Sequence, residues 1–230
     1  MRWRQFRSRR GPTAEESATR DRERMVAEQL EARGLRDAEL LEAFRSVPRH
    51  RFVESDEAYG DRALPVGSGQ TISQPYVVAR MTAAARPATG WQGARVLEVG
   101  TGSGYQAALL AAMGADVTSV ERHRELADAA AARLSAAGYP GIEVVVGDGS
   151  RGWPGGAPYA AILVTAAGPS IPEPLLQQLA ADGGRLVMPI GAREHQLLTL
   201  VERHGSDATS RVLDPVVFVP LIGEFGFPAE

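Results

Sequence analysis

The pattern of hydrophobic and polar residues changes near residue 94. Beyond that point, short apolar runs alternate with longer segments in which apolar residues recur at helical spacing. Strands that alternate with helices are typical of a parallel sheet covered by helices on both faces. We predict strands over residues 95–99, 117–120, 142–146, 159–165 and 185–190, and helices over residues 104–114, 122–138 and 172–181.

The alternation ends after residue 190. Residues 196–203 and 212–222 both have strand patterns, and no helical pattern lies between them. Two successive strands without a crossover helix predict an antiparallel hairpin at the sheet edge. The expected fold class is therefore α/β and Rossmann-like, with a mostly parallel sheet that ends in an antiparallel C-terminal strand.

The N-terminal third favours helices. Thr13 and Glu16 have the spacing of a capping box, which predicts a helix that runs to Gly34. A second helix over 37–47 should end before a proline, and residues 48–74 form an irregular connection. Pro75 suits the first turn of a helix that reaches about residue 86. These elements would form an N-terminal helical segment in front of the sheet.

The length of 230 residues fits one sizeable domain. We expect a single domain over 13–224 and a C-terminal tail over 225–230. Residues 1–12 should form a flexible basic tail, because the first ten residues carry five arginines and no acid. Within the domain we expect N-terminal helices and an acceptor loop (13–90), a cofactor-binding core (91–191) and C-terminal strands (192–224).

Charge and composition narrow the functional classes. The net charge of −3 does not favour nucleic acid or an anionic membrane as a partner, and no apolar run is long enough for a membrane span. The absence of cysteine excludes thiolate chemistry and disulfides. The four histidines lack metal-ligand spacing with one another, so we expect no metal site. We expect a monomeric, cytoplasmic protein.

A glycine-rich loop follows the first strand of the core. Gly100, Gly102 and Gly104 let the backbone approach a ligand closely at the start of a helix. The loop also contains Thr101 and Ser103. Its G-x-G-x-G pattern follows an acidic residue, Glu98, and resembles the S-adenosylmethionine loop rather than the G-x-G-x-x-G dinucleotide fingerprint. Glu98 could offset the cationic methionine half of that cofactor, whereas it would repel a pyrophosphate.

Three further residues end predicted strands, where ligands bind in this topology. Glu121 follows Gly100 by 21 residues, a spacing that places an acid to accept both ribose hydroxyls. Taken alone, it could be an exposed helix-cap acid. Asp148 precedes Gly149, and this pair could equally be a simple turn. Thr165 ends the fourth strand and should border the reaction site.

A polar segment lies before the helix that Pro75 begins. Considered without their neighbours, Thr71 and Ser73 would be turn or N-cap residues. Hydroxyls beside a helix N-terminus can also orient an anion without transferring a full charge. That second interpretation suits methyl transfer to a carboxylate, which is ionised at neutral pH and needs no strong base.

These motifs together resemble the protein-L-isoaspartate O-methyltransferase family from residue 26 to about residue 224. The segments that carry the resemblance are 47–53 (VPRHRFV), 59–65, 69–75 (GQTISQP), 97–108, 147–149 (GDG), 162–167 and 218–221 (FVPL). The resemblance implies a class I methyltransferase fold, S-adenosyl-L-methionine as the cofactor and S-adenosyl-L-homocysteine as its product. It also implies methylation of the α-carboxylate of L-isoaspartyl residues in damaged proteins and peptides, which starts repair through a succinimide.

The resemblance also implies roles for particular residues. Ser73 corresponds to the residue regarded as catalytic, and we expect Thr71, two positions before it, to be catalytic as well. Asp148 would meet the adenine amino group, and residues 218–221 would help to close over the substrate. The segment Gln70, Thr71, Ile72 and Ser73 would line the cofactor.

The chain departs from the family pattern at three positions. Ala160 stands where an Asp is usual, Val217 where an Arg is frequent, and Ser150 where a Trp is common. These departures leave open a relative that methylates an ordinary Asp of one dedicated peptide during biosynthesis. An NAD-dependent oxidoreductase could use a similar glycine loop, and a non-catalytic adaptor could capture isoaspartyl proteins.

Overall fold

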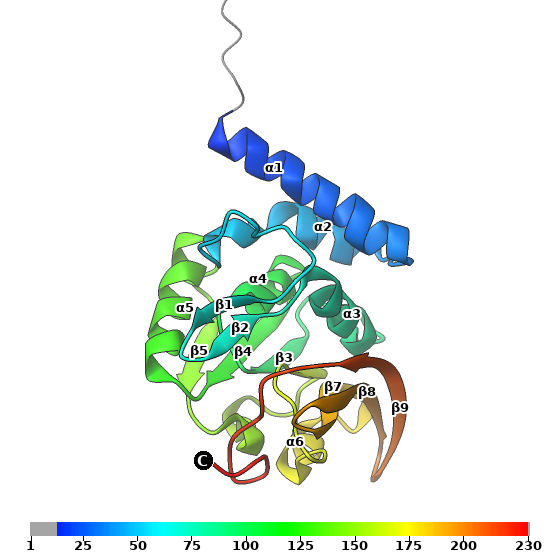
Figure 1. Cartoon of the computed structure of the whole chain (residues 1–230). Coiled ribbons are helices and arrows are strands. Elements are labelled where there is room, and N and C mark those ends of the chain that lie inside the picture. The colour runs from blue at the N-terminus through cyan, green and yellow to red at the C-terminus, as the bar shows by residue number, and fades with distance from the viewer. Residues whose placement is uncertain (1–12, 230) are drawn as a thin grey trace, which may run out of the picture.

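The computed structural model describes residues 13–229, and the arginine-rich segment 1–12 lies outside them. A seven-stranded sheet forms its centre, with the strand order β5-β4-β3-β6-β7-β8-β9 (Figure 1). The strands are β3 (Arg95–Val99), β4 (Asp116–Glu121), β5 (Glu143–Val146), β6 (Ala161–Val164), β7 (Asp182–Ala192), β8 (His195–His204) and β9 (Asp207–Val216).

The directions of the strands confirm the predicted fold class. Strands β3 to β7 pair in parallel, whereas β8 pairs antiparallel with both β7 and β9. The carboxyl ends of β3, β4 and β6 therefore meet at one edge of the sheet, where ligands bind in this topology.

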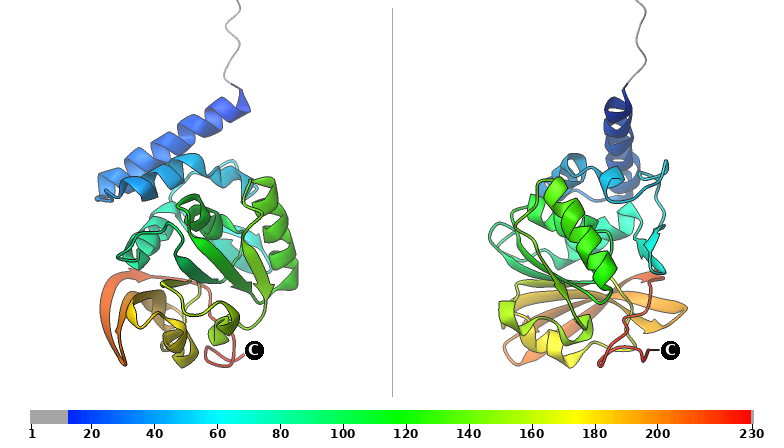
Figure 2. Two further views of the ribbon diagram at one scale, coloured as in Figure 1. Left: turned by 180° about the vertical axis from the view of Figure 1, so that it is seen from behind. Right: turned by 90° about the vertical axis from the view of Figure 1, so that its left-hand side faces the viewer.

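Six α-helices are described, and their packing agrees with the predicted alternation. They are α1 (Ala14–Met25), α2 (Ala38–Ser46), α3 (Pro75–Ala85), α4 (Tyr105–Ala112), α5 (Arg124–Ala136) and α6 (Glu173–Gln178). Helix α4 packs on β4 and α5 packs on β4 and β5, while α3 packs on β6, β7 and β8. Helices α1 and α2 lie at the end of the molecule opposite the C-terminus (Figure 2). No described helix is long and apolar enough to cross a membrane.

Buried strands explain the two-sided core. In β6, Ala161 and Leu163 belong to one hydrophobic cluster, whereas Ile162 and Val164 belong to another. Successive side chains of a strand point to opposite faces, so a parallel strand covered on both faces must be apolar throughout. The continuous run AILV has this property, and all four residues are buried.

Several boundaries differ from the sequence-based expectation. Part of the region expected to be irregular forms a hairpin of β1 (Leu64–Gly67) and β2 (Gln70–Ile72), whose register shifts between Pro65 and Gly67. The predicted strand over 212–222 begins earlier and leaves the sheet after Val216. The helix predicted over 172–181 is shorter, because its last residues enter the connection to β7.

The N-terminal helix starts where the sequence predicts, but its helix type changes along its length. Thr13 and Glu16 form both hydrogen bonds of the capping box, at 3.2 and 2.7 Å. After Met25 the helix continues as a π turn (Val26–Leu30) and a 3-10 turn (Glu31–Arg33). Gly34 ends it in the left-handed conformation, as its position predicts.

Candidate cofactor and acceptor site

The glycine loop lies between β3 and α4 and needs glycine for two reasons. Gly100, Gly102 and Gly104 have φ values of 95°, 52° and 89°, a region that other residues rarely adopt. A Cβ atom at Gly100 would also collide with the Thr165 hydroxyl, whereas one at Gly102 would meet nothing within 4 Å. The backbone at Gly102 is therefore open to a ligand.

Thr165 holds the start of this loop. Its backbone amide donates to the Val99 carbonyl at 2.9 Å, and its hydroxyl donates to the Gly100 carbonyl at 2.8 Å. The end of β6 is thereby tied to the turn after β3. The sequence predicts Thr165 at the border of the reaction site, and in the structure this residue lines two neighbouring cavities.

Glu98 is a fully buried carboxyl group at the end of β3. Its Oε2 accepts a short hydrogen bond from Ser119, whose hydroxyl is 2.6 Å from that of Thr101. Its Oε1 has no hydrogen-bond partner among the described residues. Burial, with a further contribution from Glu121, raises the pKa of Glu98 to about 8, although the hydrogen bond from Ser119 opposes this. An incoming cation would stabilise the ionised form of this carboxyl.

Glu121 ends β4 and organises two backbone amides. One carboxylate oxygen accepts from Gly102 at 3.0 Å, and the other accepts from His123 at 3.0 Å. The side chain is only 4% exposed, yet it lines the cavity. Its remaining lone pairs are therefore available to hydroxyl groups of a ligand.

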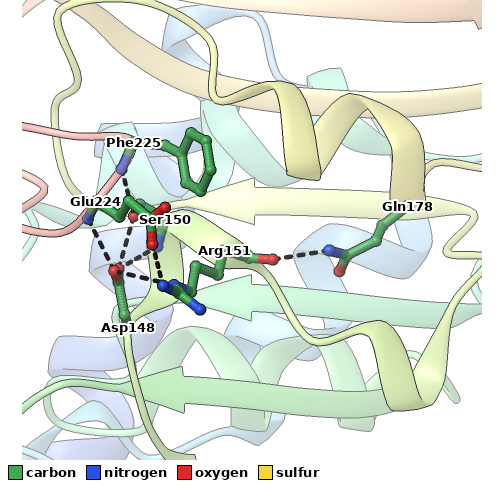
Figure 3. Close-up of polar contacts among 6 residues, drawn as sticks. All are labelled: Asp148, Ser150, Arg151, Gln178, Glu224 and Phe225. Atoms are coloured by element: carbon green, nitrogen blue, oxygen red, sulfur yellow. Dashed lines mark hydrogen bonds and ion pairs between the residues drawn. The ribbon is translucent and has the colours of Figure 1, made fainter.

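Asp148 follows β5 and binds the C-terminal segment, as Figure 3 shows. Its Oδ1 accepts from the amide and hydroxyl of Ser150, and its Oδ2 accepts from the Glu224 amide at 2.8 Å. Ser150 also accepts from the Phe225 amide at 3.0 Å, and Arg151 pairs closely with the Glu224 carboxylate. We call residues 222–227 the C-terminal hook. The departure at Ser150 thus supplies an anchor for the hook.

One cavity collects most of the residues that the sequence singled out for cofactor binding. The predicted residues that line it are Gln70, Thr71, Ile72, Ser73, Glu98, Gly100, Thr101, Gly102, Ser103, Glu121, Gly149 and Thr165. Gly104 and Asp148 do not line it. Gly104 precedes α4, where a Cβ atom would come within 3.1 Å of the Leu134 side chain, and the Asp148 carboxylate accepts a hydrogen bond from the hook.

The cavity also contains residues that sequence reasoning missed. Tyr105 and Gln106 come from the first turn of α4, Met81 comes from α3, and Pro220 and Ile222 come from the C-terminal segment. The helical residues looked like ordinary core positions. Only the adjacency of Tyr105 to the glycine loop could have marked it.

A second cavity, of about 810 Å³, adjoins the first. Its walls come from Ser73 and Val77, from the turn between β7 and β8, and from residues 215–219. Val217, one of the departures, lines it and is 76% exposed. The two cavities share four residues, Thr71, Ser73, Thr165 and Val219, and we call these the junction.

The family model for protein-L-isoaspartate(D-aspartate) O-methyltransferases matches residues 20–226. The chain belongs to this family. A protein-L-isoaspartate O-methyltransferase from Methanoculleus marisnigri is 55% identical over 215 residues, which are 92% of this chain and 96% of that relative. A relative from Rhodopseudomonas palustris is 52% identical over 211 residues, which are 90% of this chain and 84% of that relative.

Solved structures of protein-L-isoaspartate O-methyltransferases share the fold. One of them has a TM-score of 0.79 and 28% sequence identity, and the match covers 89% of this chain and 67% of that protein's chain. A second, from Plasmodium falciparum, was solved with S-adenosyl-L-homocysteine and has a TM-score of 0.73 at 23% identity, covering 86% and 96%. The family and enzyme class predicted from the sequence are thus confirmed.

Proposed function

We propose that this chain moves a methyl group from S-adenosylmethionine to the α-carboxylate of L-isoaspartyl residues, and that the junction is where the transfer occurs. The observation that carries the proposal is the wall of four residues shared by the two cavities. A donor in one cavity and a carboxylate in the other would meet across Thr71, Ser73 and Thr165. Methyl transfer needs such alignment more than it needs acid–base chemistry.

The residues of the first cavity fit the cofactor on two counts. The unpartnered Oε1 of Glu98 provides a buried acceptor for a cationic group, and the open backbone at Gly102 provides a surface without side chains. We propose that Glu98 faces the methionine half and that Glu121 accepts the ribose hydroxyls, with the glycine loop between them. When bound, S-adenosylmethionine supplies an electrophilic methyl group.

We propose that Ser73 and Thr71 orient the acceptor. Ser73 follows β2, and Pro75 begins α3 just beyond it. Hydroxyl donors at this place can hold one carboxylate oxygen in a fixed direction while the other faces the first cavity. The acceptor is already ionised, so neither residue has to remove a proton.

Repair would follow without further help from the enzyme. The peptide nitrogen after the methylated residue attacks the ester carbonyl, the new C–N bond closes a succinimide, and methanol leaves. Hydrolysis of the succinimide then gives aspartate in part. Only the methyl transfer requires the site described above.

We further propose that residues 13–224 act as one methyltransferase domain, divided as the sequence suggests, and that the chain works as a cytoplasmic monomer. Its partners would be peptides or proteins that carry isoaspartate, without nucleic acid or membrane. The net charge of −3 supports this choice of partner.

The decisive experiment is methyl transfer onto two peptides that differ only in isoaspartate or aspartate. We expect a base-labile methyl ester on the isoaspartyl peptide alone. An ester on the aspartyl peptide alone would instead indicate a dedicated biosynthetic substrate. Binding of NADH without binding of S-adenosylhomocysteine would contradict the proposed site.

A further inference from the structure

Arg49 is a fully buried cation behind the acceptor loop. It lies in the 3-10 turn Arg49–Arg51 and is 0% exposed. Its Nε donates to the Ala58 carbonyl at 2.7 Å, and its Nη2 donates to the Ser73 carbonyl at 2.9 Å. One guanidinium group therefore joins the backbone of Ser73 to a turn 15 residues earlier in the chain.

The same guanidinium faces the wall of the first cavity. It lies over the ring of Tyr105, 5.1 Å from the ring centroid. Tyr105 begins α4 directly after the glycine loop and lines the cavity that the cofactor would occupy. Arg49 thus contacts both the acceptor loop and a residue of the donor cavity.

The charge of Arg49 is balanced by dipoles and a ring. Burial lowers the pKa of Arg49 to about 10, so the group stays cationic at neutral pH. The carboxylate that attracts it, Asp61, is ion-paired with Arg33 at 2.7 Å. A buried charge is costly unless it is hydrogen-bonded, and here two carbonyl groups accept from Nε and Nη2 and the group lies over the ring of Tyr105. Its Nη1 has no hydrogen-bond partner among the described residues. Lysine has a single nitrogen and cannot reproduce this planar arrangement.

We propose that Arg49 is a positioning residue for methyl transfer, which fixes Ser73 at the junction by holding its carbonyl against the wall of the donor cavity. This inference rests on the proposed function, because it assumes that Ser73 orients the acceptor. Arg49 lines neither cavity, so it would act on the reaction through Ser73 rather than by contact with a substrate.

The test compares Arg49→Lys with Arg203→Lys in the full chain. Arg203 is a matched control, since its Nη1 donates to the carbonyls of Leu176, Gln177 and Leu179 and it lines neither cavity. We expect Arg49→Lys to lower kcat about 10- to 100-fold, as small misplacements of reacting groups do. Affinity for S-adenosylhomocysteine, measured by calorimetry, should change little, and Arg203→Lys should leave kcat near the wild-type value.

A double-mutant cycle with Ser73→Ala separates positioning through Ser73 from other roles. If Arg49 acts through Ser73, Arg49→Lys should have little further effect in the Ser73→Ala background. Additive losses of kcat would overturn the inference. So would an Arg49→Lys variant that is folded, binds S-adenosylhomocysteine and keeps wild-type kcat.

Folding and the proposed function have separate readouts. Arg49→Gln, which keeps an uncharged donor, serves as a second variant. If both Arg49 variants are unfolded where Arg203→Lys is folded, Arg49 is a folding residue and the inference fails. If Ser73→Ala itself keeps full turnover, the proposed role of Ser73 fails instead.

Discussion

The carboxylate of Glu121 accepts a hydrogen bond from the backbone amide of Gly102 at 3.0 Å. This hydrogen bond ties the end of β4 to the glycine loop that follows β3, at the sheet edge where the two strands terminate together. The acid therefore shapes the loop even before a ligand is present, and it faces the cavity with the lone pairs that remain.

Glu121→Gln should weaken cofactor binding. The glutamine side chain lacks the negative charge that strengthens hydrogen bonds from hydroxyl groups, so we expect an affinity for the cofactor that is about tenfold lower. Calorimetric titration with S-adenosylhomocysteine measures the change. Glu125→Gln is the control, because Glu125 is an exposed acid in the first turn of α5. Equal affinities for the two variants would refute the proposed role of Glu121.

Ser73→Ala should reduce turnover while leaving the cofactor bound. Removing one donor at the junction loosens the acceptor carboxylate, and we expect a loss of about 10- to 100-fold in kcat on an isoaspartyl peptide. Ser68→Ala, in the turn of the β1–β2 hairpin, is a nearby control that lines neither cavity. A Ser73→Ala enzyme with unchanged kcat would count against our assignment.

Glu98 should make the stability of the ligand-free protein depend on pH. Its pKa is raised from 4.5 in the unfolded chain to about 8 in the fold, so the folded protein retains a proton that the unfolded chain releases. The stabilisation is complete below about pH 4.5 and is lost as the pH rises to about 8. The free energy of unfolding should therefore fall across this window in the wild type.

Glu98→Gln should remove this contribution, because glutamine does not titrate. Chemical denaturation at a series of pH values would show a flatter dependence in the variant than in the wild type. Glu125→Gln again serves as the control and should follow the wild type. Parallel curves for wild type and Glu98→Gln would mean that the carboxyl is already ionised in the empty cavity.

Gly223→Ala should displace the C-terminal hook. A Cβ atom at this position would collide with the Asp148 carboxylate, and Ile222 beside it lines the donor cavity. We expect S-adenosylhomocysteine to dissociate several-fold faster, as measured by stopped-flow competition. Gly141→Ala is the matched control, since a Cβ atom there meets nothing within 4 Å. The same dissociation rate in both variants would show that the hook does not cover the cofactor.

The sequence predicted the sheet, and it singled out most of the residues that line the first cavity, because both depend on local patterns. The buried run 161–164 and the loop around Gly102 have few structural alternatives. The hairpin of β1 and β2 escaped prediction, since its strands have only four and three residues and are too short to show a clear strand pattern. No local pattern revealed that Arg49 reaches the Ser73 carbonyl or that the hook binds Asp148, because these contacts join residues that are 24 and 76 positions apart in the sequence.

The junction has a consequence for changing what this enzyme accepts. Both cavities are lined by Thr71, Ser73, Thr165 and Val219, so under the proposed function a substitution there alters the binding of the methyl donor and of the acceptor together. Glu194, His195 and Val217 line the second cavity and not the first. Substitutions at such residues of the second cavity can therefore change the substrate range, in evolution or by engineering, while the affinity for the methyl donor stays constant.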